Sequence, residues 1–293
     1  MRQITCVNGN SNISCIFGEE GFTPFLLENA EGIYELSARV TVTENTLTDG
    51  STYQSSMLET RNIVLTLRDR EDADHTANRQ FLLALFPVRS EGTLIFEDGS
   101  EKRQISYYVE KLTSDGVFYS RAYQISLICP DPYFYDTSDV VVTLAAFVPN
   151  FVFQHEFTAA KEEFGYRQAN RLQNLKDEFG TDGIGMEITI SASAPVRNPQ
   201  IIRVESDEHI AVGTNDMPLD MAAGDRVIIT TADNQKRIWF LHEGVRTNIS
   251  HYLAEGSSFI QLHRGNNSIG YSAASGVDAM IISIKYRFQY ASA

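Results

Sequence analysis

The chain has 293 residues, of which 43% are hydrophobic and 21% charged, a composition typical of a folded protein with room for two ordinary domains. A formal net charge of −14 argues against a nucleic-acid partner, because phosphate binding needs basic patches. No apolar stretch approaches membrane-spanning length, and the N-terminus does not resemble a signal peptide. We therefore expect neither nucleic acid nor membrane as a partner.

The three cysteines are Cys6, Cys15 and Cys129, and their spacing fits no metal site. Cys6 and Cys15 are placed to be cross-strand neighbours in a hairpin. The favoured interpretation for all three is a reduced, buried thiol, which predicts folding in a reducing cytosol.

The first half of the chain is typical of strands interrupted by one helix. Residues 34–43 alternate apolar and polar side chains, which predicts a half-buried strand, and Asp49-Gly50 follows as a loop tip. Apolar residues at spacings of three and four predict a helix over 76–86, ended by Pro87. Further strands are predicted at 13–17, 61–68, 92–96, 103–109 and 123–128, with a tight turn at Asp98-Gly99.

The second half is predicted to be almost entirely β. A buried strand is expected at 140–147, whereas the apolar spacing and propensity of 158–179 favour a helix. Asn198-Pro199 is expected to break a strand. Regular short strands with turn residues between them predict a β-sandwich; they lie at 185–192, 201–204, 209–212, 226–231, 236–241, 259–262, 269–271 and 279–286.

A proline-rich and aromatic segment lies near the middle of the chain. It reads Cys129, Pro130, Asp131, Pro132, Tyr133, Phe134, Tyr135, Asp136. The two prolines fix φ and remove backbone donors, so neither a helix nor a central strand continues through them. The aromatic residues carry too much apolar surface for a free linker. We interpret the segment as a rigid, packed seam between a domain at 1–136 and a domain at 137–293.

Residues that carry chemistry are scattered. A carboxylate directly follows a histidine only at His155-Glu156 and His242-Glu243, and neighbours on a strand point to opposite faces, so we predict no metal site. Gly180–Gly185 precedes a strand rather than opening a helix, which favours a turn over a phosphate loop. No catalytic motif is present, and we predict no catalytic residue and no cofactor.

Two further features are ambiguous. Asp69 and the acidic run at 71–74 are more typical of a solvated loop and a first helical turn than of a cation site. Trp239, the single tryptophan, lies between Ile238 and Phe240, which favours sheet or core packing over a sugar-stacking platform.

The order of several motifs is distinctive. They are 79–87, 92–96, Cys-Pro-Asp-Pro-Tyr-Phe-Tyr at 129–135, Asn-Pro-Gln-Ile at 198–201, 224–229, and Leu-x-x-Gly-x-Asn-x-Ile-x-Tyr at 262–271. Over nearly the whole chain this order resembles the distal tail protein family of long-tailed (siphovirus-type) bacteriophages and prophages.

The resemblance implies a mainly β chain. Its first domain would be a strand-rich α+β ring-forming unit with one helix. Its second would be a galectin-like β-sandwich, whose last strand is free to pack back on the first domain. The resemblance also implies strands after the seam, and we expect strands for the second half of 158–179. On this interpretation Pro130 and Pro132 set the angle between the domains, and Tyr133, Phe134 and Tyr135 hold it.

The resemblance further implies a hexameric ring at the virion tail tip, assembled in the host cytoplasm. The ring would join the tail tube protein to a tail-associated hub protein and carry peripheral receptor-binding or baseplate proteins. Head-to-tail contacts of this kind close naturally into rings and need no catalytic cleft. The alternatives are a carbohydrate-binding module with Trp239 as its platform, and a hydrolase built on the scattered acids and histidines.

Overall fold

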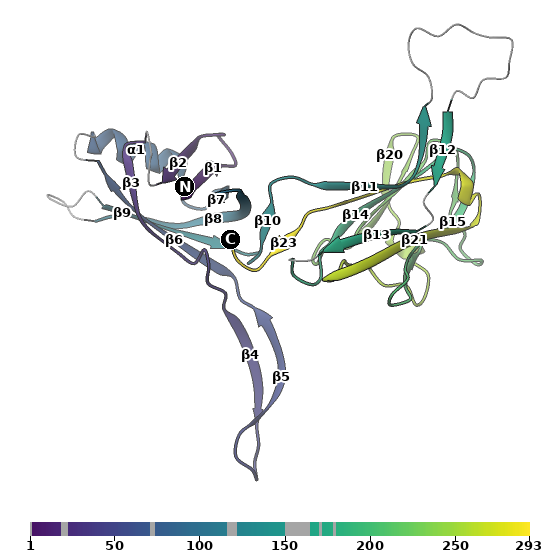
Figure 1. Cartoon of the computed structure of the whole chain (residues 1–293), viewed down its shortest axis with the longest axis horizontal. Helices are drawn as coiled ribbons and strands as arrows, with labels where there is room; N and C mark the ends of the chain where they lie inside the picture. The colour runs from purple at the N-terminus through teal and green to yellow at the C-terminus, as the bar shows by residue number, and fades with distance from the viewer. Residues whose placement is uncertain are drawn as a thin grey trace, which may run out of the picture. The chain divides into compact units, whose positions relative to one another are not determined.

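The computed structural model describes residues 2–18, 23–70, 74–115, 122–149, 165–169, 172–177 and 180–293 (Figure 1). It divides into two compact units, one formed by Met1–Thr137 with Gln289–Ala293 and the other by Ser138–Phe288. The chain thus leaves the first unit after Thr137 and returns to it for its last residues. No helix among the described residues is long and apolar enough to cross a membrane.

The first unit is built on one antiparallel sheet of nine strands. The main path runs β2-β1-β7-β8-β9-β6-β3, with β10 pairing both β8 and β23. The strands are β1 (Arg2–Asn8), β2 (Ser14–Gly18), β3 (Phe25–Glu31), β6 (Arg61–Asp69), β7 (Glu91–Asp98), β8 (Glu101–Asp115), β9 (Ala122–Cys129), β10 (Phe134–Asp136) and β23 (Gln289–Tyr290). The predicted turn at Asp98-Gly99 is confirmed, since Asp98 pairs with Glu101 and Gly99 has a φ of 63°.

One helix covers the core side of this sheet. Helix α1 (His75–Leu85) buries Leu82 and Leu85 against the inward-facing side chains of the strands. Its first turn is capped by Asp74, whose carboxylate accepts hydrogen bonds from the backbone N–H groups of Thr76 and Ala77 at 2.9 and 3.2 Å. The predicted helix and its end before Pro87 are confirmed.

Asn8 joins the end of β1 to the last turn of α1. Its side-chain Nδ2 donates to the carbonyls of Ala84 and Leu85 at 3.3 and 3.1 Å, and these are groups that a helix end leaves unpaired. Its Oδ1 accepts from the backbone N–H groups of Asn10 and Ser11, which form the turn into β2. A single buried amide therefore stabilises both the helix end and the hairpin.

A long hairpin, the arm, contains β4 (Ala38–Glu44) and β5 (Ser51–Leu58) and projects from the first unit (Figure 1). These strands pair only with each other, and β4 is exposed along its whole length. The strand predicted at 34–43 is confirmed over 38–43, but its predicted half-burial is wrong, because no described part of the chain covers its apolar face. The loop tip at Asp49-Gly50 is confirmed, with Gly50 at a φ of 93°.

The second unit is a β-sandwich. A seven-stranded sheet runs β12-β11-β22-β14-β18-β19-β20, and a second sheet runs β13-β21-β15-β16 with β17 beside β15. Both sheets contribute to one core, which includes Ile188, Ile229 and Ile284 from the first and Ile201, Ile210 and Ile269 from the second. The strands are β11 (Val140–Pro149), β12 (Gly165–Ala169), β13 (Leu172–Asp177), β14 (Met186–Ala192), β15 (Val196–Arg203), β16 (Glu208–Ala211), β17 (Asp220–Met221), β18 (Arg226–Thr230), β19 (Arg237–His242), β20 (Val245–Asn248), β21 (Gly265–Ser275) and β22 (Met280–Tyr286), with short 3-10 helices at Ser250–Tyr252 and Val277–Ala279.

At three places in the second unit, the structure differs from what the sequence pattern predicts. Within 158–179 the described residues form β12 and β13 rather than a helix, as the family resemblance implies. Asn198-Pro199 does not end a strand, because β15 continues through it with Asn198 at a φ of 48° and outside the pairing with β21. The stretch 259–262 is not a strand and makes only an isolated bridge between Leu262 and Ile184.

We predict that Asn8→Ala lowers the free energy of unfolding by about 1–3 kcal/mol, because buried carbonyl and N–H groups lose their partner. Urea unfolding followed by circular dichroism measures the change. The matched control is Asn10→Ala, at an exposed position of the same turn, for which we expect a change within about 0.5 kcal/mol. Equal effects of the two substitutions would contradict the role assigned to Asn8.

Candidate functional site

The predicted seam lies at the edge of the first unit. Cys129 is the last residue of β9 and is fully buried, while Pro130 is exposed. Phe134 begins β10 and lies in the core of the unit, whereas Pro132, Tyr133 and Tyr135 are half-buried. The segment is therefore packed through one aromatic side chain rather than through all three.

Asp131 shapes the turn between the prolines. Its Oδ1 accepts a hydrogen bond from the backbone N–H of Tyr133 at 3.1 Å, and its Oδ2 accepts one from the Tyr135 hydroxyl at 2.6 Å. This is the local side-chain-to-backbone bond by which aspartate stabilises turns. The turn carries the chain from β9 into β10.

Arg61, at the start of β6, is the centre of this region. Its side chain donates to five backbone carbonyls: those of Gly32, Ile33, Glu35, Pro132 and Ala291, at 2.6–3.0 Å. Its guanidinium also lies 5.0 Å from the centre of the Phe134 ring, within the range of a cation–π contact. We call Arg61 and the carbonyls that it binds the arginine clamp.

The clamp joins three segments that are far apart in the sequence: the base of the arm, the seam and the C-terminal residues. Arg61 is only 5% exposed. Desolvation lowers the pKa of Arg61, but an arginine side chain stays charged in proteins. Its buried charge is therefore stabilised by the hydrogen bonds that replace its hydration. The guanidinium binds backbone oxygens and lies over an aromatic ring, which makes the clamp depend on the course of the main chain.

Arg103 holds the C-terminal residues from the other side. Its Nη1 donates to the carbonyl of Ser292 at 2.7 Å, and its guanidinium lies 4.0 Å from the centre of the Tyr290 ring. The short strand β23 pairs with β10, with Phe134 opposite Tyr290. Two arginines thus fix the returning end of the chain on the first unit.

A second charged residue is buried at the opposite end of β6. The carboxylate of Asp69 accepts from Asn78 Nδ2 at 2.7 Å and from the Tyr123 hydroxyl at 3.0 Å, and it lies 2.6 Å from His75 Nδ1. Asp69 therefore anchors the start of α1, and the prediction that it belongs to a solvated loop is wrong. Residues 71–73 of the acidic run lie outside the described residues.

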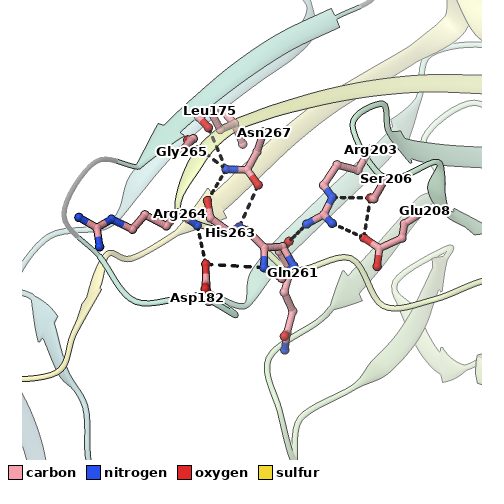
Figure 2. A network of polar contacts seen from close by, with 10 residues as sticks. All are labelled: Leu175, Asp182, Arg203, Ser206, Glu208, Gln261, His263, Arg264, Gly265 and Asn267. Carbon is pink, nitrogen blue, oxygen red and sulfur yellow. Dashed lines mark hydrogen bonds and ion pairs between the residues drawn. The ribbon is translucent and has the colours of Figure 1, made fainter.

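The Leu-x-x-Gly-x-Asn-x-Ile-x-Tyr motif has a structural explanation in the second unit (Figure 2). Asn267 is 1% exposed, and its Nδ2 donates to the carbonyls of Leu175 and His263 at 3.2 and 2.6 Å. Its Oδ1 accepts from the His263 N–H at 2.8 Å. Asn267 thereby holds the loop before β21 against β13, so the motif stabilises the sandwich.

Arg203 lies close to this loop and is also buried (Figure 2). It donates to Ser206 Oγ at 2.7 Å and to the Gln261 carbonyl at 2.9 Å, and it pairs with Glu208 at 2.8 Å. The predicted turn at Gly180–Gly185 is tied to the same segment, because the N–H groups of Gly183 and Ile184 donate to the Leu262 carbonyl. These contacts are internal to the sandwich.

The predicted histidine–carboxylate pairs form no metal centre in the part of the chain that the structure describes. His242 pairs with Asp225, whose Oδ1 lies 2.8 Å from His242 Nδ1, rather than with its sequence neighbour Glu243. The hydrogen bond and the charge of Asp225 raise the pKa of His242. His155-Glu156 lies outside the described residues.

Trp239 faces outward from β19 and is half-buried, while its neighbour Ile238 faces the core. The guanidinium of Arg246 on β20 lies 4.2 Å from the centre of the indole ring. One face of the ring is thus covered by an arginine, which leaves less of it for stacking on a sugar.

We predict that Arg61→Met unfolds the first unit at lower urea concentration, with a loss of about 3 kcal/mol or more, because several buried carbonyls lose their donor. Arg61→Lys is expected to rescue little, since an ammonium has fewer donors and no fork geometry. The single tryptophan, Trp239, belongs to the second unit, so its fluorescence reports that unit alone while circular dichroism reports both.

The matched control is Arg39→Met on the arm, where the side chain is 78% exposed and lies 3.6 Å from Glu59. We expect this variant to unfold like the parent chain. A Trp239 transition that moves as far as the circular dichroism transition in Arg61→Met would contradict a clamp that acts on the first unit.

The raised pKa of His242 predicts a pH-dependent contribution to stability. Asp225 favours protonated His242 in the folded state, so the stabilisation is complete below the unfolded pKa, about 6.5, and is lost as the pH rises through the folded pKa. His242→Gln should therefore destabilise the chain more at about pH 5.5 than at about pH 8.5. NMR titration of the ring gives a direct check, and an unchanged midpoint in Asp225→Asn would disprove the pairing.

No protein-family model matches the chain, and no curated protein matches it significantly. This chain is similar in structure to the SPP1 Dit (gp 19.1) protein. That protein is described as a paradigm of the hub adsorption apparatus in phages that infect Gram-positive bacteria. The match has a TM-score of 0.65 and 14% identity, and covers 98% of this chain and 99% of that one. A chain of the phage P2 baseplate in its activated conformation with Ca has a TM-score of 0.50 at 9% identity, with 100% of each chain covered.

Matches at such low sequence identity are evidence of a similar fold alone. The two alignments cover 98% and 100% of this chain and therefore include both units. The mainly β fold is therefore similar to that of the SPP1 protein along nearly the whole length. At the level of fold, the expected resemblance of this chain to the distal tail proteins of long-tailed phages is confirmed.

Proposed function

We propose that this chain is a structural hub protein of a phage tail, located at the tail tip. Copies of it would form a ring, six per ring, that joins the tail tube to the tail-tip hub protein and carries receptor-binding or baseplate proteins. The observation that carries the proposal is the full-length match to the SPP1 hub protein, because both units and their order along the chain are shared. The same match supports a structural, non-enzymatic role.

The arm supports a role in assembly. Register pairs on one face of the hairpin are Ala38 with Leu58, Val40 with Ser56, and Val42 with Tyr53. Val40, Val42 and Tyr53 are 55%, 51% and 61% exposed, so an apolar face lies open to solvent. We call these residues the apolar face of the arm.

Such a face has a physical cost that a partner would remove. An isolated two-stranded hairpin is marginally stable in water, and exposed apolar surface of this kind marks an interaction site. Leu47 at the tip is 97% exposed, which extends the apolar surface to the end of the arm. A contact in which each arm packs on the next copy is head-to-tail, and repeated rotation closes such contacts into a ring.

The negative net charge fits a protein that assembles in a defined order. Copies with a formal charge of −14 repel one another at long range, so association needs a specific short-range surface. The apolar face of the arm provides a surface of that kind. The galectin-like sandwich is, in this proposal, the part that carries peripheral proteins rather than a sugar-binding site.

Oligomeric state tests the proposal. We expect the full chain to form a ring with a mass of six 32.8 kDa copies, alone or on mixing with the tail-tube and hub proteins of the same tail. Val42→Asp should weaken ring formation at least about tenfold, because burying an unpaired carboxylate costs more than the about 1.4 kcal/mol that a factor of ten represents. Light scattering and native mass spectrometry measure both.

The matched control is Thr41→Asp, which adds the same charge one residue away on the opposite face of the hairpin. We expect this variant to assemble like the parent chain. A chain that stays monomeric at high concentration and with its tail partners would disprove the proposed function. Equal loss from both aspartates would disprove only the role of the apolar face.

A further inference from the structure

Two cysteines of the first unit lie directly opposite each other. The register of β1 and β2 pairs Cys6 with Cys15, and both are free thiols. Buried and more exposed residues alternate along both strands, and both cysteines are on the buried face. Their side chains therefore project from adjacent strands into the same part of the core.

The hydrogen-bond pattern sets the spacing of this pair. The N–H of Asn8 donates to the carbonyl of Ile13 at 2.9 Å, which is one of the two bonds of a hydrogen-bonded pair and sets the phase of the antiparallel ladder. Such pairs recur at every second residue, which makes Cys6 and Cys15 a pair of the same type. Opposed Cα atoms in this arrangement are about 5.5 Å apart, inside the about 4.4–6.8 Å range of disulfides. Their Cβ atoms, up to about 5.5 Å apart, must approach to about 4.5 Å or less, so bond formation requires a local movement of the strands.

We propose that Cys6 and Cys15 form a site of reversible oxidation, at which a low-molecular-weight disulfide such as oxidised glutathione converts them to a cross-strand disulfide. One thiolate attacks the small disulfide, forms a mixed disulfide and releases one small thiol. The second thiolate then attacks the mixed disulfide, forms the Cys6–Cys15 bond and releases the second small thiol. The two protons of the cysteines go to the released thiolates, and the small disulfide is reduced.

The fold restricts this exchange to a locally opened state. Burial raises the pKa of Cys15 to about 11 and the pKa of Cys6 well above its ordinary value, so few thiolates form in the closed hairpin. Strand β2 has five residues and a single neighbour in the sheet, which makes it an edge element that opens more easily than the sheet centre. Oxidation is therefore slow and follows the opening of β2.

Cys129 provides an internal comparison. It is fully buried in the same core, but its register partner on β6 is Arg61 and not a cysteine. Burial also raises the pKa of Cys129, to about 12. Thiol burial is thus common to all three cysteines, whereas a directly opposed partner is particular to Cys6 and Cys15.

The disulfide would fix an edge strand. It would tie β2, which places Phe17 in the core, to β1 at the fourth of their five register pairs. The opening of the hairpin would then be suppressed, because a crosslink removes extended states of the open segment. This inference concerns the stability of one hairpin and does not depend on the proposed function.

The test uses the purified full chain in mixtures of oxidised and reduced glutathione. Peptide mapping by mass spectrometry under non-reducing conditions should show a Cys6–Cys15 link that forms slowly, forms faster in urea below the unfolding transition, and disappears on reduction. Cys129 should stay unlinked. Hydrogen exchange of the β2 amides should slow by about tenfold or more in the oxidised chain.

Cys129→Ala is the matched control and should leave the Cys6–Cys15 link unchanged, while Cys6→Ala and Cys15→Ala should each abolish it. Alanine is small and apolar, so we expect each variant to fold. Circular dichroism checks this before the thiols are mapped. Free thiols at Cys6 and Cys15 under the most oxidising mixture, glutathione retained on Cys15 as a mixed disulfide, or a link that includes Cys129 would each overturn the proposal.

Discussion

The first unit depends on a buried positive charge that is bound by main-chain oxygens and one aromatic ring. Arg61 binds carbonyls from residues 32–35, from Pro132 and from Ala291. A charge removed from water is costly unless hydrogen bonds replace its hydration, so these chain segments must all be in place before the arginine is satisfied. The clamp therefore selects one arrangement of the main chain at this end of the sheet.

This requirement couples the chain end to its beginning. Ala291 is 230 residues from Arg61 along the chain. Strand β23, which pairs with β10, follows the whole second unit in the sequence. Contacts this distant in sequence slow folding, because a long loop must close before the contact is gained. Two cation–ring contacts, of Arg61 with Phe134 and of Arg103 with Tyr290, add stabilisation at the closing point.

The sequence contains a signal that both charges are buried, and the prediction of a strand at 61–68 does not use it. In β6 the inward positions are Arg61, Ile63, Leu65, Leu67 and Asp69, so each charge is in phase with the apolar core residues. Period-two alternation predicts the strand, and charges at inward positions indicate buried polar networks. Their partners could not be predicted, since they are carbonyls and side chains brought in by distant segments.

The same reasoning explains why the arm is misread from its sequence. Val40 and Val42 alternate with threonines as in a half-buried strand, but periodicity cannot tell whether a covering layer belongs to the same chain. The helix pattern at 158–179 fails for a related reason, since propensity is weak beside the pairing that β13 makes with β21. Local patterns therefore predict the helix and most strands, while the site residues depend on long-range contacts.

The arm and the clamp are physically connected. Three of the carbonyls that Arg61 binds, those of Gly32, Ile33 and Glu35, lie just before the first strand of the arm. Gly32 has a φ of 82°, and a Cβ there would lie 2.0 Å from the Asn62 carbonyl oxygen, so only glycine fits this turn. The hairpin has no core of its own, and its direction is set by this buried base. The apolar face of the arm, which we propose packs on a neighbouring copy, is thereby held by the residue that also fixes the end of the chain.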